Sequence, residues 1–172
     1  MKTLDRKSSV LAIEPRSKGL GYVFVDHKCR LIDWGVHEVR IAKRRRCLKH
    51  AIRLIRGFQP SFVILENPDA PSAHRSRWVH DLIHNITREA ESEGVNTHLL
   101  SRRDVLICFC NRSDGSTDGI SKAVCSHFPE LSARLPKRRR VWETEHYSTA
   151  LFMAAALSVT FFTKQSDTNN SS

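Results

Sequence analysis

The stretch Val10-Leu-Ala-Ile-Glu14-Pro-Arg-Ser-Lys-Gly19-Leu-Gly-Tyr-Val-Phe-Val-Asp26 determines how the fold is interpreted. It contains two runs rich in Val, Ile and aromatic residues, separated by a short segment with proline and glycine, which is typical of two β-strands joined by a turn. A third run of the same kind, 31–39, follows after only four residues (27–30). The N-terminal part of the chain therefore predicts three strands in an antiparallel meander.

Beyond residue 40 the hydrophobic pattern alternates between the helical and the extended period. The expected elements are, in order, a helix at 43–56 that Gly57 ends, a strand at 61–65, a helix at 76–93, a strand at 96–100, and helices near 101–109, 120–128 and 143–163. One mixed sheet with helices on both faces satisfies this order, so the fold class is α/β. We expect a single domain over 1–163 and a disordered polar tail over 164–172.

The charge balance favours a polyanionic partner. The 172 residues include 28 Lys and Arg against 18 Asp and Glu, which gives a net charge of +10. The basic residues that form the candidate nucleic-acid-binding surface are Lys43, Arg44, Arg45, Arg46, Arg75, Arg77, Lys137, Arg138, Arg139 and Arg140. Side chains of this kind contact phosphates and give affinity and salt dependence rather than sequence readout. Solvated helix faces and nuclear-localisation signals remain alternative interpretations of the two basic tetrads.

Compartment and membrane association can also be addressed from the sequence. The five cysteines are an odd number without paired spacing, which favours a reducing compartment. The segment 147–162 is apolar, but it is shorter than the roughly 20 residues that a membrane-spanning helix needs. No export signal is visible at the N-terminus. We therefore expect a cytoplasmic protein that does not associate with a membrane.

Two glutamates stand where apolar strands end. Glu14 follows 10–13 and Glu66 follows 61–65. If the two strands are adjacent and parallel, both side chains reach the crevice outside the carboxyl edge of the sheet, where α/β proteins bind ligands. Paired carboxylates are usually tolerated because a divalent cation such as Mg²⁺ lies between them. Two solvated strand ends are the alternative. A third acidic group, Glu143 with Glu145, precedes the last expected helix and would also suit the helix dipole.

Several motifs resemble one known family. They are Leu-Ala-Ile-Glu-Pro-Arg-Ser-Lys-Gly-Leu-Gly-Tyr (11–22), Leu-Ile-Asp-Trp-Gly (31–35), Val-Ile-Leu-Glu-Asn-Pro (63–68) and Trp-Glu-Thr-Glu-His-Tyr (142–147). In their order and spacing, from residue 10 to about 162, they resemble the RuvC family of Holliday-junction endonucleases, which has the ribonuclease-H-like fold.

The resemblance implies a five-stranded sheet of order 3-2-1-4-5, with strand 2 antiparallel, and a site of four acidic residues that binds Mg²⁺ or Mn²⁺. It assigns metal binding and catalysis to Glu14, Glu66 and Glu145, and a further catalytic role to His146. The fourth acidic position of the family falls on Thr149 or Met153, according to the register of the last helix. Neither residue can bind Mg²⁺ as a carboxylate would.

Two functions follow from these matches and departures. The first is a Mg²⁺-dependent, structure-selective DNA endonuclease, a crossover-junction endodeoxyribonuclease of DNA recombination and repair that acts on branched DNA. The second is a catalytically degenerate relative that binds nucleic acid or serves as a scaffold without cutting. A homodimer is implied by the family, because a junction has two strands to cut.

One further pair of residues has a spacing suited to metal binding. His80 and His84 lie one turn apart on the expected helix at 76–93, a spacing that zinc can use. No third ligand is evident from the sequence, so an ordinary helix surface is the default expectation.

Overall fold

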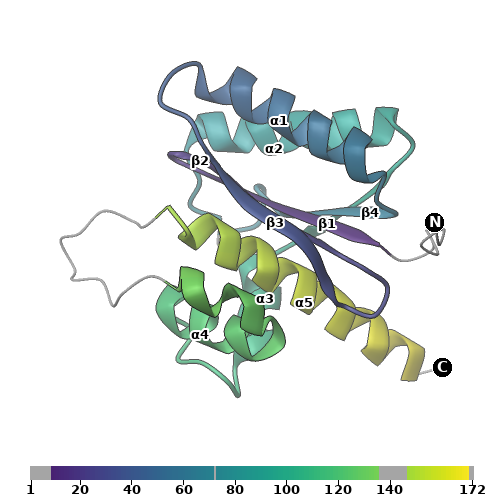
Figure 1. Cartoon of the computed structure of the whole chain (residues 1–172), viewed down its shortest axis with the longest axis vertical. Helices are drawn as coiled ribbons and strands as arrows, with labels where there is room; N and C mark the ends of the chain where they lie inside the picture. Colours follow the sequence, from purple (N-terminus) through teal and green to yellow (C-terminus); the bar gives the residue numbers. More distant parts are fainter. Residues whose placement is uncertain (1–8, 72, 136–146, 171–172) are drawn as a thin grey trace.

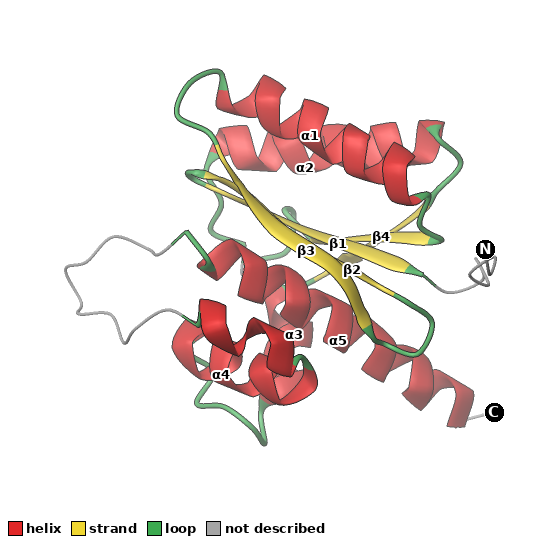
Figure 2. Cartoon of the chain, in the orientation of Figure 1, coloured by secondary structure: helices red, strands yellow, loops and turns green. Residues whose placement is uncertain are grey.

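The structure is a computed structural model, and it describes residues 9–71, 73–135 and 147–170. Figure 1 shows the path of the chain and Figure 2 its secondary structure. The elements are β1 (Val10–Arg16), β2 (Gly19–Val25), β3 (Leu31–Glu38), α1 (Lys43–Phe58), β4 (Phe62–Glu66), α2 (Arg77–Ser92), β5 (Asn96–Leu100), α3 (Arg102–Phe109), α4 (Thr117–His127), the 3₁₀ helix η2 (Pro129–Arg134) and α5 (Thr149–Asn170).

The five strands form one mixed sheet of order β3-β2-β1-β4-β5. β2 is antiparallel to both β1 and β3, whereas β1 pairs with β4, and β4 with β5, in parallel. The predicted α/β class, the predicted strand order and the antiparallel second strand are therefore confirmed. The N-terminal meander follows from short turns, and each parallel pairing follows from a helical crossover.

Helices cover both faces of the sheet. Figures 1 and 2 show α1 and α2 on one face and α3, α4 and α5 on the other. The strand period of two separates the two cores: in β1, Leu11 and Ile13 join the core under α1 and α2, whereas Val10 and Ala12 join the core under α5. Residue 14 continues the second series, so Glu14 belongs to the face that α5 covers.

α5 explains the long apolar run near the C-terminus. Its residues 149–161 are all buried, because the helix packs against β1 and β2 on one side and against α3 and α4 on the other. A helix that is apolar all round is expected in such a position. Among the described residues, no helix is long and apolar enough to cross a membrane.

Two helix ends differ from the prediction. α1 continues through Gly57 to Phe58, and the next residue, Gln59, adopts the left-handed backbone conformation (φ 47°) that usually favours glycine. α4 begins earlier than expected, at Thr117, because the Ser116 side chain accepts a hydrogen bond from the backbone N–H of Gly119 at 3.0 Å. Hydroxyl capping of this kind satisfies a donor that the first turn leaves free.

The C-terminal segment also differs from the expected disordered tail. α5 extends to Asn170, so residues 164–170 are helical. The Lys164 ammonium lies 2.7 Å from a carboxylate oxygen of Asp104 in α3 and ties the first turn beyond the apolar part to the domain. The expected start of this helix, 143–146, lies outside the described residues.

Candidate active site: an acidic pair bridged by an arginine

The structure brings Glu14 and Glu66 together at the carboxyl edge of the sheet. Ala12 and Ile64 are neighbours across the parallel β1–β4 pair, and each glutamate stands two residues further along its strand. Both glutamates therefore point to the α5 face. Glu14 is completely buried and Glu66 is 8% exposed.

Arg75 bridges the two carboxylates. Its Nη2 donates to Glu14 Oε1 at 2.5 Å and also to Glu66 Oε2. Arg16 adds a second guanidinium, with Nε 2.9 Å from Glu14 Oε1. Arg75 lies in the loop between β4 and α2, and the sequence predicted it to bind nucleic acid. In the structure its guanidinium faces the acidic pair and its side chain is only 12% exposed.

A third arginine lies next to this group, at the start of α3. Arg102 Nη1 lies 3.2 Å from the Met153 sulfur of α5. Met153 is one of the two positions that the sequence offered for a fourth acid, and the other, Thr149, lies one turn earlier on α5 and is also buried. Both positions on α5 thus carry a buried residue that has no carboxylate.

The electrostatics of the cluster follow from burial and from these charges. Burial and the neighbouring Glu14 raise the pKa of Glu66, although Arg75 and Arg16 oppose the shift. Burial alone would lower the pKa of Arg75, but the attraction of both carboxylates outweighs it and raises that pKa. Burial lowers the pKa of Arg102. With all groups charged, three guanidinium groups face two carboxylates, so the described cluster carries a net charge of +1.

Part of this geometry suits a divalent cation. Carboxylate oxygens are the ligands that Mg²⁺ prefers, and Glu14 Oε2 is buried with no hydrogen-bond partner among the described residues. The Arg75 guanidinium, however, fills the point at which the two carboxylates converge. Arg75 is on a loop without regular secondary structure, so it can leave without unfolding a helix or strand. The donor set fits a divalent ion once Arg75 has moved out.

A glycine allows α5 to approach the acidic pair. Gly21 of β2 is the direct partner of Glu14 in the β1–β2 ladder. A Cβ at Gly21 would lie 2.3 Å from the backbone of Ala150 and Leu151, closer than any such contact can be. The first turn of α5 can therefore lie directly on the strand beside Glu14. The predicted site residues Glu145 and His146 precede this turn in the sequence and lie outside the described residues.

The topology gathers several helix N-termini at the edge of the sheet that carries the glutamates. α2 follows the loop after Glu66, and α3 starts after Leu100, which is the β5 partner of Glu66. α1 starts at the same edge, where Lys43 Nζ donates to the backbone oxygen of Ser17 at 3.0 Å. Because helix N-termini carry partial positive charge, this edge favours phosphate groups.

The described basic residues largely share this edge. Arg44, Arg45 and Arg46 are exposed in the first turn of α1, and Arg77 is exposed at the start of α2. Arg44 lies 3.5 Å from an oxygen of Asp81. The predicted second tetrad, residues 137–140, lies outside the described residues.

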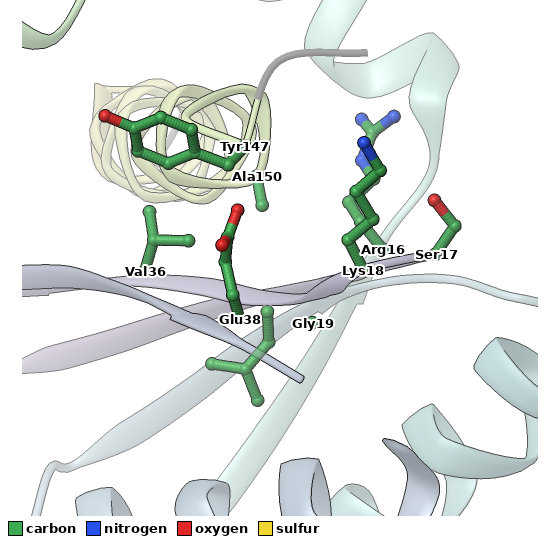
Figure 3. Close-up of a pocket in the computed structure, with 9 residues that line it drawn as sticks. Arg16, Ser17, Lys18, Gly19, Val36, Glu38, Tyr147 and Ala150 are labelled. Atoms are coloured by element: carbon green, nitrogen blue, oxygen red, sulfur yellow. The ribbon is translucent and has the colours of Figure 1, made fainter. Parts of the chain in front are cut away.

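A small pocket adjoins the acidic pair through Arg16. Figure 3 shows Arg16, Ser17 and Lys18 of the β1–β2 turn on one side of it, with Val36, Glu38 and Tyr147 on the other.

The roles of Arg16 and Arg102 were not predicted from the sequence. Their nearness to the ends of β1 and β5 was the available signal, since a residue just beyond the carboxyl end of a strand lies at the crevice.

Comparisons with known proteins support the fold. No protein-family model and no curated protein sequence matches the chain. Solved structures do match: Thermus thermophilus RuvC in complex with a Holliday-junction substrate has a TM-score of 0.65 at 15% identity, covering 92% of this chain and 96% of that one. Another Thermus thermophilus RuvC structure gives 0.65 at 16% identity, covering 91% and 96%. The yeast mitochondrial Holliday-junction resolvase Ydc2 gives 0.57 at 14% identity, covering 96% and 82%.

These matches define the class of fold. The chain has a ribonuclease-H-like α/β fold of the RuvC type over nearly its whole length, which confirms the resemblance found in the sequence motifs. At this level of identity the matches establish the fold, and the activity has to be argued from the site.

Proposed function

We propose that this protein is a structure-selective endonuclease, similar to Holliday-junction resolvases, that hydrolyses phosphodiester bonds in branched DNA with Mg²⁺ or Mn²⁺. The observation that carries the proposal is the convergence of Glu14 and Glu66, both buried, on one face of the sheet at its carboxyl edge. Burying two like charges side by side is costly, and a structural role alone does not require it.

Glu14 and Glu66 would hold the metal, with Glu145 and His146 as further groups supplied by the sequence before α5. A divalent ion bound to such carboxylates activates water and stabilises the charge that develops on the phosphate. The unpartnered Glu14 Oε2 is the oxygen available to it without breaking a hydrogen bond.

Arg75 would act as an internal counter-ion that gives way to substrate. Without DNA and metal, its guanidinium forms an ion pair with both carboxylates. A phosphate at this edge offers the same bidentate oxygen geometry, so the DNA backbone can draw Arg75 away as the metal enters. Arg75 would then face the scissile phosphate.

The exposed basic residues at the start of α1 and α2 would contact the arms of the DNA, together with residues 137–140 of the second tetrad. Phosphate contacts position the substrate without reading its sequence. Recognition by shape suits branched DNA, and cutting two strands of a junction suits a homodimer. Such an enzyme would act in recombination and DNA repair, in the cytoplasm.

A second candidate function is supported by a specific observation. The cluster holds three guanidinium groups against two carboxylates, and neither Thr149 nor Met153, the two α5 positions expected for the fourth acid, is acidic. Loss of a ligand from a metal site is expected to cost orders of magnitude in activity, because misplacement of about 1 Å can cost 10²-fold. A protein that binds branched DNA without cutting would retain the basic edge and the internal Arg75 ion pairs.

The two candidates are separated by a cleavage assay on a labelled four-way junction and on a linear duplex of the same sequence. Wild type is compared with Glu66→Gln, with and without Mn²⁺ or Mg²⁺, and binding is measured in parallel. Metal-dependent cutting of the junction that Glu66→Gln loses, while binding persists, supports the endonuclease. Equal binding by both proteins without cutting in either metal supports the second candidate.

A further inference from the structure

A second cluster of metal-ligating side chains lies on the surface away from the acidic pair. His80 and His84 project from one face of α2, and Asp69 comes from the loop after β4. His80 Nε2 lies 2.7 Å from Asp69 Oδ1, and His84 Nε2 lies 3.2 Å from Asp69 Oδ2. The structure thus supplies the third ligand that the sequence pattern of two histidines lacked.

The arrangement is close to the geometry of a tetrahedral metal site. The three ligand atoms lie within 4.8 Å of one another. Zinc bonds of about 2.0–2.1 Å to imidazole and carboxylate imply ligand atoms about 3.3 Å apart. The two imidazole nitrogens lie 2.7 and 3.2 Å from Asp69 oxygens, near that separation, so side-chain rotations within the 4.8 Å cluster are enough to complete the geometry.

We propose that Asp69, His80 and His84 form a binding site for a zinc-type divalent cation, with water as the fourth ligand. Two imidazoles and one carboxylate are a donor set that borderline metals prefer and that Mg²⁺ does not. The three side chains are 37–58% exposed, so the fourth position is open to solvent. This site is independent of the endonuclease proposal, which rests on carboxylates at another place.

Neighbouring groups already orient the ligands. The backbone N–H of Asp69 donates to Asn67 Oδ1 at 3.0 Å, which shapes the loop around the carboxylate. An Asp81 oxygen lies 3.9 Å from His80 Nδ1, the ring nitrogen opposite the proposed metal, which is beyond hydrogen-bond distance, so a small movement is needed before it can accept from the ring. A carboxylate behind a ligating histidine is the usual outer partner in zinc sites, where it stabilises the ring orientation.

The site would connect two functional segments. The loop between β4 and α2 carries both Asp69 and Arg75, and it leads directly from Glu66. A metal shared by Asp69 and two α2 histidines fastens this loop to the helix. It would therefore restrain the segment from which Arg75 reaches the acidic pair.

The test is metal titration of the full-length, tag-free protein with Co²⁺ as a spectroscopic probe and with Zn²⁺ by calorimetry. We expect one equivalent of Co²⁺ to bind and to produce visible d–d bands. Thiolate-to-metal charge-transfer bands, which would indicate binding by the free cysteines, should be absent. His84→Ala and Asp69→Asn are each expected to weaken binding by more than about 10-fold, since even the loss of an outer partner costs that much.

The matched control is His27→Ala, because His27 is an exposed histidine at the β2–β3 hairpin outside the cluster. It should bind metal like wild type. The proposal is overturned if wild type binds no metal below millimolar concentration, if His84→Ala or Asp69→Asn binds as wild type does, or if the spectrum shows thiolate ligands. In those cases the three side chains form a surface ion-pair cluster only.

Discussion

Replacing Arg75 with alanine should destabilise the protein and make its stability depend on divalent metal. Arg75 is 12% exposed and lies between Glu14 and Glu66, whose side chains are 1% and 10% exposed. Removing one partner of a buried ion pair costs about 3–5 kcal/mol, because a buried charge is left uncompensated. Arg16 remains 2.9 Å from Glu14, so we expect a loss near the lower limit, about 3 kcal/mol.

Metal should restore part of this loss, because a divalent ion can replace the missing positive charge. At a metal concentration of 100 times Kd, binding to the folded state adds about 2.7 kcal/mol. In wild type the same metal has to displace Arg75, so its stabilising effect should be much smaller. The difference between variant and wild type therefore reports competition between arginine and metal for the two carboxylates.

The measurement is urea unfolding of wild type and Arg75→Ala at neutral pH, followed by circular dichroism with and without Mg²⁺ or Mn²⁺. Arg77→Ala is the matched control, since Arg77 is exposed and lies two residues further along; it should change the free energy of unfolding by less than about 0.5 kcal/mol. A loss below about 1 kcal/mol for Arg75→Ala, or equal stabilisation of variant and wild type by metal, would refute the reasoning.

Three further predictions concern packing, pH and DNA affinity. Gly21→Ala should lower the free energy of unfolding by about 1–3 kcal/mol or more, because its Cβ would lie 2.3 Å from the α5 backbone. Gly57→Ala should raise it by about 0.5–1 kcal/mol, because Gly57 lies in a helix with nothing within 4 Å of the added Cβ. Urea unfolding compares the two variants, and equal effects would contradict the close approach of α5. The pKa of Glu66 is raised, so the folded state holds this proton more tightly than the unfolded chain does. The contribution of Glu66 to the free energy of unfolding should therefore fall as the pH rises above 4.5, the ordinary pKa of a glutamate. Glu66→Gln should remove that part of the slope in unfolding free energy at pH values above 4.5, and an unchanged slope would show that the shift is absent. Arg45→Ala should reduce the slope of log binding constant against log salt concentration for a DNA junction by about 0.9, the value for one phosphate contact. Lys28→Ala, at the opposite edge of the sheet, should leave this slope unchanged. If fluorescence anisotropy gives the same slope for Arg45→Ala as for wild type, Arg45 is not in the interface.

Much of the fold was predictable because it follows from local pattern. Apolar runs with the strand period, separated by short turns, gave the meander, and the helical period between later strands gave the crossovers. The strand period also places Glu14 on the same face of β1 as Val10 and Ala12, and this much follows from the sequence. That α5 covers this face is known only from the structure.

The environment of the acidic pair was not predictable in the same way. Arg75 reaches both glutamates from an irregular loop, and neither loop conformation nor the side-chain direction follows from periodicity. The sequence therefore assigned Arg75 to DNA by its charge alone. The contact between Arg102 and Met153 joins residues 51 positions apart, and it depends on how α3 and α5 pack.

The zinc-type cluster shows the same limit. The spacing of His80 and His84 on one helix face is readable from the sequence, because residues four apart are neighbours on a helix. Asp69 lies 11 residues before His80, across the loop. Only the folded loop brings its carboxylate between the two rings.

The decisive measurement is single-turnover cleavage of a four-way DNA junction by wild type in Mn²⁺, with Glu14→Gln as the matched variant. If the buried glutamates form a catalytic pair, wild type cuts strands near the branch point in a metal-dependent reaction, and the variant binds the junction but leaves it intact. Junction binding by wild type without any metal-dependent cutting would contradict the endonuclease proposal and leave a DNA-binding protein whose acidic pair is closed by Arg75.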